Sequence, residues 1–270
     1  MVLTDLALAR RLDRAEGAAN ARFVEARARA RPDLGAEWIE VSGTYAMFDG
    51  VGSPLTQTFG LGLFSPPTAD DLTTLETFFR DRGAEVFHEV SPLADAAHLA
   101  LLAERGYRPV ELTTVLHRPV LLAGHETPAP ADVVARRIAP GEEARWAEVA
   151  GAAWGSESEP LGAFSRDFGL VSAHARGASC FLAEIGGEIV GTGVVALHGG
   201  VALLAGASTL PAWRRRGAQG ALLRARLAHA AAEGCDLAMM GAAPGSGSQA
   251  NAARAGFRVA YTRAKWHRGG

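Results

Sequence analysis

The sequence predicts an α/β fold (α+β under some schemes) built as two similar domains, each with a mixed, mostly antiparallel central sheet flanked by helices. Three observations carry this prediction. A strand, a basic glycine-bearing turn and a helix follow one another over residues 201–234, strand-like and helix-like segments alternate elsewhere, and the two halves end in similar segments. With 270 residues and 48% hydrophobic content, the chain can bury one large core or two small ones.

The first half begins with a helical pattern and continues as strands and helices separated by glycine and proline turns. Within the first helix, Gly17 predicts a break. Thr68 followed by Asp71 resembles a capping box, which typically opens a helix. The segments expected in this half are helix 4–30, strands 38–48 and 55–64, helix 68–82, strand 84–90, helix 95–105 and strand 107–119.

The second half follows residues 121–132, which contain two prolines and show no period, and which we interpret as a linker. The Gly186-Gly187 pair is typical of a hairpin turn. An antiparallel region should therefore precede a parallel β-α-β unit. The segments expected are strand 133–138, helices 142–154 and 164–175, strands 179–185, 188–197 and 201–209, helix 221–234, strand 237–242, helix 246–255 and strand 257–266.

A candidate anion site lies where strand 201–209 ends. Pro211 stops the strand, and the three arginines Arg214–Arg216 precede Gly217 and Gly220 at the start of the helix. The first N–H groups of a helix have no intrahelical partner and lie at the positive end of its dipole. Glycines let a phosphate approach such a backbone closely. The residues predict a phosphate or pyrophosphate site, although neither the dinucleotide nor the Walker glycine pattern is present.

This turn resembles the coenzyme A loop of the GNAT acyltransferase superfamily, whose pattern is Gln/Arg-x-x-Gly-x-Gly/Ala after a strand. Here the pattern runs from Arg214 to Gln219, and Gln219 departs from the small residue at its last position, although Gly220 follows at once. A solvated basic turn is the alternative interpretation. The order of elements in the second half is also that of the family, so the resemblance covers 131–270 well and 36–120 loosely.

The resemblance implies acetyl-CoA as cosubstrate, with its thioester between strands 201–209 and 237–242, which splay apart in the family. Ser248 is alternatively the N-terminal cap of the last helix, and Asn251 alternatively a surface residue. The residues implied to bind the coenzyme are Thr209 and Leu210 beside the pantetheine arm, Arg214, Arg215, Arg216, Gly217, Ala218, Gln219 and Gly220 at the pyrophosphate, and Ser248 and Asn251 on the last helix.

The similar ends of the two halves indicate an internal duplication. Residues 101–118 and 251–268 share six positions at a constant offset of 150, with phenylalanine for tyrosine at one of them. The chain therefore resembles a tandem GNAT protein. Its expected parts are a degenerate GNAT-like domain over 1–120, the linker 121–132 and an acetyltransferase domain over 133–270.

The first copy differs from the second where the basic loop should be. In the corresponding stretch, Pro66 and Pro67 remove two amide donors, and Asp70 and Asp71 would repel a pyrophosphate. We therefore expect one coenzyme per chain, bound by the second copy.

The catalytic groups are less clear than the coenzyme loop. Acyl transfer requires a neutral amine, so a base or a water chain has to take up the proton of the amine. Many GNAT enzymes use a glutamate on the strand before the loop and a tyrosine on the last helix, but strand 201–209 has no acid and Ala252 stands at the tyrosine position. The candidates, each with a structural alternative, are Glu157 and Glu159 in an acidic loop, His198 beside a glycine turn, Ser208 and Tyr261.

The sequence thus predicts an acyl-CoA-dependent N-acyltransferase that moves acetyl to an amine by direct attack in a ternary complex, with catalysis resting mainly on positioning. The acidic candidates favour a cationic acceptor, either a small molecule or a peptide. Because the family's glutamate and tyrosine are missing, a non-catalytic acyl-CoA-binding or sensing protein is the alternative, and a scaffold without ligand is a third.

Composition sets further expectations. A net charge of −2 predicts no nucleic-acid surface, and two cysteines predict no disulfide framework and fit a reducing cytosol. We also expect no metal site, no membrane span and no signal peptide, because the sequence has no metal-ligand spacing, no long apolar run and no signal pattern. A cytoplasmic protein follows, and a homodimer is compatible with these patterns.

Overall fold

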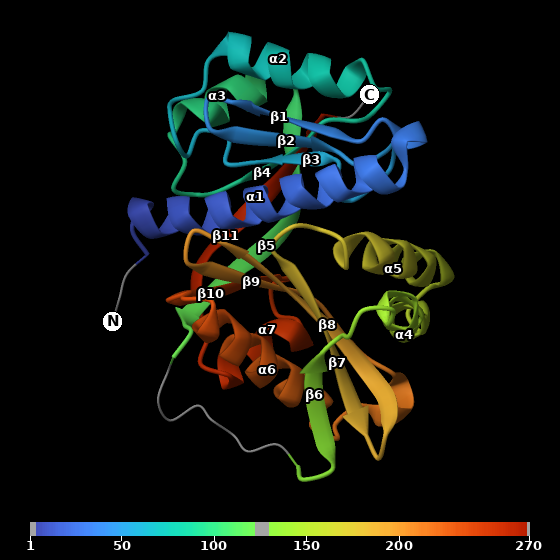
Figure 1. Ribbon diagram of the computed structural model, residues 1–270. Coiled ribbons are helices and arrows are strands. Elements are labelled where there is room, and N and C mark those ends of the chain that lie inside the picture. Colours follow the sequence, from blue (N-terminus) through green and yellow to red (C-terminus); the bar gives the residue numbers. More distant parts are fainter. Residues whose placement is uncertain (1–3, 122–129, 269–270) are drawn as a thin grey trace. The chain divides into compact units, whose positions relative to one another are not determined.

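A computed structural model describes residues 4–121 and 130–268 of the chain (Figure 1). These residues form two compact units, one from the positions up to His117 together with those from Gly241 onward, the other from Arg118–Met240. The end of the chain therefore belongs to the same unit as its first half. Most of the predicted linker lies outside the described residues, and the predicted division into 1–120 and 133–270 stays a prediction.

The first unit is a mixed sheet with helices on both faces. Its strand order is β1-β2-β3-β4-β11-β5, in which β3 and β4 run parallel and the other neighbours antiparallel. Its elements are α1 Leu6–Ala30, the 3-10 turn Pro32–Leu34, β1 Glu37–Val41, β2 Thr44–Phe48, β3 Gln57–Phe59, α2 Ala69–Arg80, β4 Phe87–Val90, α3 Ala97–Glu104, β5 Tyr107–Pro119, α7 Gly247–Arg254 and β11 Arg258–Arg268.

Side chains of β2 alternate between two cores, because successive residues of a strand point to opposite faces of the sheet. Tyr45 and Met47 pack with α1, whereas Ala46 and Phe48 pack with the apolar side of α2. Figure 1 shows α1 and α2 on opposite faces of these strands. The predicted capping box opens α2, since Thr68 accepts from the Asp71 amide and Asp71 from the Thr68 amide.

Three details of the first unit differ from the sequence prediction. The strand expected over 55–64 is only the three-residue β3, and turns follow it. The expected break at Gly17 is wrong, because α1 is continuous and Gly17 instead lets the helix approach Tyr45, whose ring would lie 2.7 Å from an added Cβ. The strand expected over 38–48 is the hairpin β1–β2, turned by Ser42 and Gly43 at positive φ.

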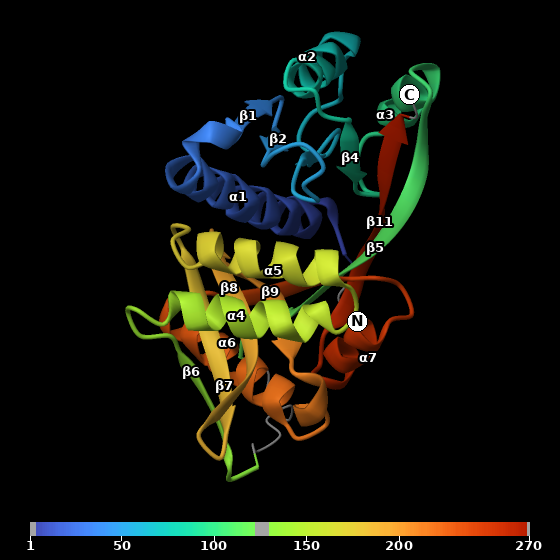
Figure 2. The ribbon, with the colours of Figure 1, turned by 90° about the vertical axis from the view of Figure 1, so that its right-hand side faces the viewer.

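The second unit contains the predicted antiparallel region followed by a parallel β-α-β unit. Its strand order is β10-β9-β8-β7-β6, and only β9 and β10 are parallel neighbours among the described strands of this unit. Figure 2 shows α4 and α5 side by side over one face of its sheet, with α6 behind the strands. The elements are β6 Val133–Arg137, α4 Glu143–Gly155, α5 Glu159–Ser172, β7 Ala178–Ile185, β8 Glu188–His198, β9 Val201–Thr209, the 3-10 turn Pro211–Trp213, α6 Ala218–Ala232 and β10 Leu237–Ala242.

The two repeat-derived strands β5 and β11 pair with each other about a local twofold axis. Arg258 pairs with His117 at one end and His267 with Arg108 at the other, and Thr113 pairs with Arg263 between them. Thr113 and Arg263 are separated by the repeat offset of 150, so the axis passes through this pair. The closing strand of the second copy therefore lies between β4 and β5 of the first unit.

A buried group of charges holds β11 in this place. Arg263 donates to both carboxylate oxygens of Glu16 on α1, at 2.7 and 2.9 Å, and to Glu89 on β4 at 2.8 Å. Tyr261 donates its hydroxyl to Asp13, whose other oxygen is buried without a partner among the described residues. Burial raises the pKa of Asp13 to about 6, against the opposing charge of Arg263.

We predict that Asp13 makes the protein less stable as the pH rises from 4 to 7. The pKa of Asp13 is about 6 in the folded chain, against an ordinary value of 3.8 for an aspartate in water, so between these values folding takes up a proton. The unfolding free energy of the wild type should therefore fall relative to that of Asp13→Asn, by on the order of 3 kcal/mol. Urea unfolding of both proteins at each pH measures this difference.

The matched control is Asp132→Asn, which removes an exposed carboxylate from the second unit. Its stability difference from the wild type should stay flat over the same range. A flat difference for Asp13→Asn as well would contradict the assignment of a proton to Asp13.

Candidate functional site

The start of α6 offers a row of unpaired backbone amides. Gly217 is the N-terminal cap residue, has φ +92°, and provides no side chain to cap the helix. The amide of Ala221 donates to Gly217, whereas the amides of 215–220 have no acceptor in the part of the chain that the structure describes. Because these N–H groups lie at the positive end of the helix, they form a site for an anion.

Two contacts fix the conformation of this turn. An added Cβ at Gly217 would lie 2.9 Å from the ring of Pro130, so both space and positive φ require glycine here. The side-chain amide of Gln219 donates to the Thr209 hydroxyl at 2.7 Å. Gln219, the departure from the family pattern, therefore ties the first turn of α6 to the end of β9.

The three arginines of the turn differ in their surroundings. Arg214 donates from Nε to the Thr209 carbonyl at 3.3 Å, and its guanidinium lies 3.9 Å from the carboxylate of Glu157. Arg216 lies over the ring of Trp213 at 4.5 Å. The side chain of Arg215 is exposed and forms no hydrogen bond or ion pair with any described residue. Arg215 and Arg216 thus remain available to a ligand at the amides.

Strand β9 loses its parallel partner halfway along its length. Pairing with β10 ends at Leu203 opposite Met239, although β9 continues to Thr209. Two residues of β9, Gly206 and Ala207, oppose one residue of β8, and Gly206 has φ +57°. This pattern is a β-bulge, which bends the strand. Strands β9 and β10 are therefore unpaired beyond Leu203, in the part where the family resemblance implies that 201–209 and 237–242 splay apart.

The end of β9 presents backbone groups on its open edge. The Leu210 amide donates to Val190 of β8, and the Leu210 carbonyl accepts from Trp213. Because backbone groups alternate sides along a strand, those of Thr209 point away from β8. The Thr209 amide can therefore pair with an extended ligand, whereas the Thr209 carbonyl already accepts from Arg214 and both backbone groups of Leu210 have partners.

A buried arginine lies beneath the bulge. Arg226 of α6 donates to the carbonyls of Val194 and Ala205, at 3.1 and 3.3 Å, and to Leu222 within its own helix. The structure describes no carboxylate within 4.0 Å of Arg226, and burial lowers the pKa of this residue to about 10. Gly193 makes room for the guanidinium, whose carbon would lie 3.0 Å from an added Cβ.

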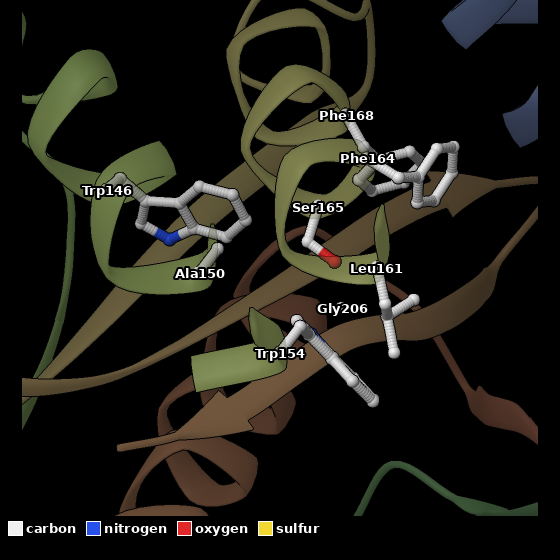
Figure 3. A pocket seen from close by; sticks show the side chains of 8 residues that line it. All are labelled: Trp146, Ala150, Trp154, Leu161, Phe164, Ser165, Phe168 and Gly206. Atoms are coloured by element: carbon white, nitrogen blue, oxygen red, sulfur yellow. The ribbon is translucent and has the colours of Figure 1, made fainter. Parts of the chain in front are cut away.

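An apolar cavity of about 210 Å³ lies beside the bulge (Figure 3). Its walls come from the facing sides of α4 and α5 and from one residue of β9. The residues that line it are Trp146, Ala150, Trp154, Leu161, Phe164, Ser165, Phe168 and Gly206.

The corresponding helix of the first unit has no such row of free amides. At the start of α2, Thr68 and Asp71 cap each other's backbone amides, and Ser42 donates to the Asp71 carboxylate at 2.8 Å. The side-chain oxygens of Thr68 and Asp71 therefore accept from amides that an anion would otherwise bind. Pro66 and Pro67, which have no amide N–H, precede this cap.

The structure places the predicted catalytic candidates in different surroundings. Glu157 is about half exposed beside Arg214, and Glu159 is the exposed first residue of α5. Ser208 is buried, with its hydroxyl 2.7 Å from that of Thr192. His198 ends β8, and Tyr261 is buried in the first unit against Asp13. The catalytic role of each candidate stays a prediction.

The two residues proposed on the last helix lie in the first unit. The alternative in which Ser248 caps α7 is wrong, because Ser246 is the cap and accepts from the Gln249 amide at 3.2 Å. Ser248 is exposed on the helix surface. Asn251 is also exposed and accepts a hydrogen bond from Arg254. Their contact with a coenzyme stays a prediction.

Sequence reasoning missed Arg226 and the cavity. Arg226 is one of several arginines in an alanine-rich helix, and no local pattern marks it as buried. No sequence signal indicates that the aromatic residues of α4 and α5 leave a space between them.

Neither a metal cluster nor a membrane-spanning helix occurs among the described residues. No three His, Cys, Asp or Glu side chains of residues 4–121 and 130–268 lie together as metal ligands. Within the same ranges, no helix combines the length and the apolar character needed to cross a bilayer.

Comparisons with known proteins agree with this geometry. A model of the acetyltransferase (GNAT) family matches residues 143–257, which run from α4 to the residue before β11. No curated protein matches the sequence.

Solved structures share the fold over most of the chain. A GCN5-related N-acetyltransferase from Kribbella flavida is 21% identical with a TM-score of 0.63, over 93% of this chain and 95% of that chain. A GCN5-related N-acetyltransferase from Sphaerobacter thermophilus is 20% identical with a TM-score of 0.57, over 86% and 75%. A tandem GNAT protein from the clavulanic acid biosynthesis pathway is 18% identical with a TM-score of 0.58, over 84% and 79%. The tandem GNAT fold expected from the sequence is confirmed.

We predict that Arg226 stabilises the second unit although its charge is buried. Replacement by methionine keeps most of the side-chain volume but leaves the Val194 and Ala205 carbonyls without this donor. Arg226→Met should lower the unfolding free energy by about 2 kcal/mol, because leaving a buried polar group unpaired costs about 1–3 kcal/mol. Chemical denaturation measures the loss.

The control is Arg216→Met, which truncates an exposed arginine just before the same helix and should change the stability little. If Arg226→Met were as stable as the wild type, the carbonyls beneath the bulge would not depend on the guanidinium.

Proposed function

We propose that this protein is an acyl-CoA-dependent N-acyltransferase that moves an acetyl group from acetyl-CoA to an amine, because residues 143–257 match the model of the GNAT acetyltransferase family. The single observation that carries the proposal is the row of unpaired amides at 215–220. This row follows the end of β9 and includes the amides of the exposed Arg215 and Arg216. A diphosphate carries the charge and the acceptor oxygens that such a row binds.

The rest of the coenzyme follows from this anchor. With the diphosphate on the amides of α6, the pantetheine arm extends along the open edge of β9 and pairs with the Thr209 backbone. Beyond that point β9 has no partner from β10, so the arm runs toward the bulge at Gly206. The thioester would then lie beside the widest part of the splay.

The transfer itself requires few protein groups. The amine nitrogen attacks the thioester carbonyl, the C–N bond forms, the C–S bond breaks, the amine loses a proton and the leaving thiolate gains one. Glu157 is our candidate for taking up the amine proton, directly or through water, because it is exposed near the loop and belongs to the turn between α4 and α5. Positioning of the two substrates supplies the remaining rate enhancement.

One coenzyme per chain is part of the proposal. The start of α2 is occupied by its own capping box, and the side chains there carry negative charge. An anion at α2 would have to displace Asp71 from the Thr68 amide. The first unit therefore does not bind the coenzyme in this mode.

We predict that charge reversal at the loop weakens coenzyme A binding. Arg215→Glu and Arg216→Glu should each raise the Kd at least about tenfold, which corresponds to about 1.4 kcal/mol, and the effect should shrink at high salt. Titration calorimetry with coenzyme A measures the Kd. A parallel assay with acetyl-CoA and a panel of amines follows the release of free thiol.

The matched control is Arg80→Glu, which reverses an exposed charge at the end of α2 in the first unit. An equal loss of affinity in this control would contradict a single site at α6. Tight binding of acetyl-CoA without turnover of any amine would instead support a non-catalytic acyl-CoA-binding protein, which the absence of an acid on β9 also favours.

A further inference from the structure

The cavity between α4 and α5 is lined almost wholly by hydrocarbon. Four of the eight lining residues are aromatic, and Ser165 is the one residue among them with a hydroxyl group. Trp146 turns its polar atom away, because its indole N–H donates to the Phe181 carbonyl at 2.8 Å. No charged side chain is among the lining residues. The cavity can therefore satisfy an apolar group but not an ionic one.

The cavity is held open by the protein and is not a loosely packed region. Next to it the two helices touch through glycines, since an added Cβ at Gly162 would lie 2.6 Å from the Cα of Gly155. Gly169 lets Trp146 pack flat, and an added Cβ there would lie 2.6 Å from its ring. Close contact with Gly169 fixes the ring of Trp146, which is one of the residues that line the space (Figure 3).

The size of the cavity matches one ring or a short branched chain. An apolar cavity of about 150 Å³ is enough to bind benzene, and this one has about 210 Å³. The space is partly open to solvent, so a ligand group can enter it. A ligand group that fills the space therefore gains both its own transfer from water and contacts that the lining side chains lack without it.

The position of the cavity relates it to the reacting atoms. Gly206, which is part of the bulge in β9, is one of the lining residues. Strand β9 is also the strand along which the pantetheine arm is proposed to run. Glu157 lies in the turn that joins the two lining helices and Glu159 is the first residue of α5, so both are between the lining residues Trp154 and Leu161 in the chain. An apolar space and an acidic turn thus occur on the same pair of helices.

We propose that this cavity binds an apolar ring or branched chain of a substrate of the transfer, and that the acceptor is accordingly an amphipathic amine with an apolar body rather than a polyamine. This inference rests on the proposed function. A longer acyl group on the coenzyme could also fill the cavity. The experiment below distinguishes an apolar acceptor amine from an apolar acyl group.

The test compares substrates and a filled cavity. The wild type is assayed with acetyl-CoA and either phenethylamine, isoamylamine, putrescine or spermidine, and separately with hexanoyl-CoA in place of acetyl-CoA. Ala150→Leu fills the cavity, and Ala152→Leu adds the same side chain at an exposed position of the same helix. Quenching of tryptophan fluorescence reports binding independently of turnover, because two tryptophans line the cavity.

The expected result is a kcat/KM at least tenfold higher for the apolar amines than for the polyamines. Ala150→Leu should remove this preference without changing the Kd of coenzyme A, and Ala152→Leu should keep it. If the apolar gain appears with hexanoyl-CoA instead, and Ala150→Leu removes it, the cavity takes the acyl chain, which keeps the apolar site but overturns the amphipathic acceptor.

Other outcomes overturn the inference. They are the absence of any apolar preference in both arms, or equal effects of Ala150→Leu and Ala152→Leu. Should Ala150→Leu fail to fold, Phe164→Ala widens the cavity at a half-buried position and is expected to shift the preference toward larger rings. Failure of the proposed function looks different, because the wild type would then either not bind coenzyme A or bind it without turnover of any amine.

Discussion

The left-handed backbone of Gly217 is the constraint on which the candidate site depends. A helix normally begins with a side chain that satisfies its first amides, as Thr68 does for α2. At Gly217, φ of +92° and the Pro130 ring at 2.9 Å from an added Cβ exclude every residue that could provide such a cap. The first amides of α6 stay without a protein acceptor because the backbone conformation at Gly217 excludes any side chain that could accept from them.

Three features lie along β9 and its neighbour β8, and each depends on a missing Cβ. The loop with Gly217 begins just after Thr209, the bulge is at Gly206, and the Arg226 guanidinium beneath the bulge occupies the space left by Gly193 of β8. A buried cation without a carboxylate is costly, and here backbone carbonyls freed by the irregular pairing provide its partners. The bulge and Arg226 are therefore mutually dependent: the irregular strand supplies acceptors, and the arginine satisfies them.

Local sequence signals predicted local structure well and distant contacts poorly. The capping box of Thr68 and the turn at Gly217 could be predicted because the interacting residues are within a few positions of each other. Gly17 was misread as a helix break because its reason, the ring of Tyr45, is distant in sequence. The same limit applies to Tyr261 and Asp13, which are 248 residues apart and form one hydrogen bond. Alternating patterns show which face of a strand is buried but not which strand lies beside it.

The pairing of β5 with β11 explains how a duplicated chain can lose symmetry without losing its fold. At the local axis, equivalent residues face each other, so two arginines there would repel, and two threonines would leave Glu16 without the guanidinium that it binds. Thr113 opposite Arg263 avoids both, and Glu16 and Glu89 neutralise the one arginine. Because β11 lies between β4 and β5, the first unit needs the last strand of the chain to complete its sheet. The first copy, in which Thr68 and Asp71 cap α2, therefore depends on β11 of the second copy, which also carries the open amides of α6.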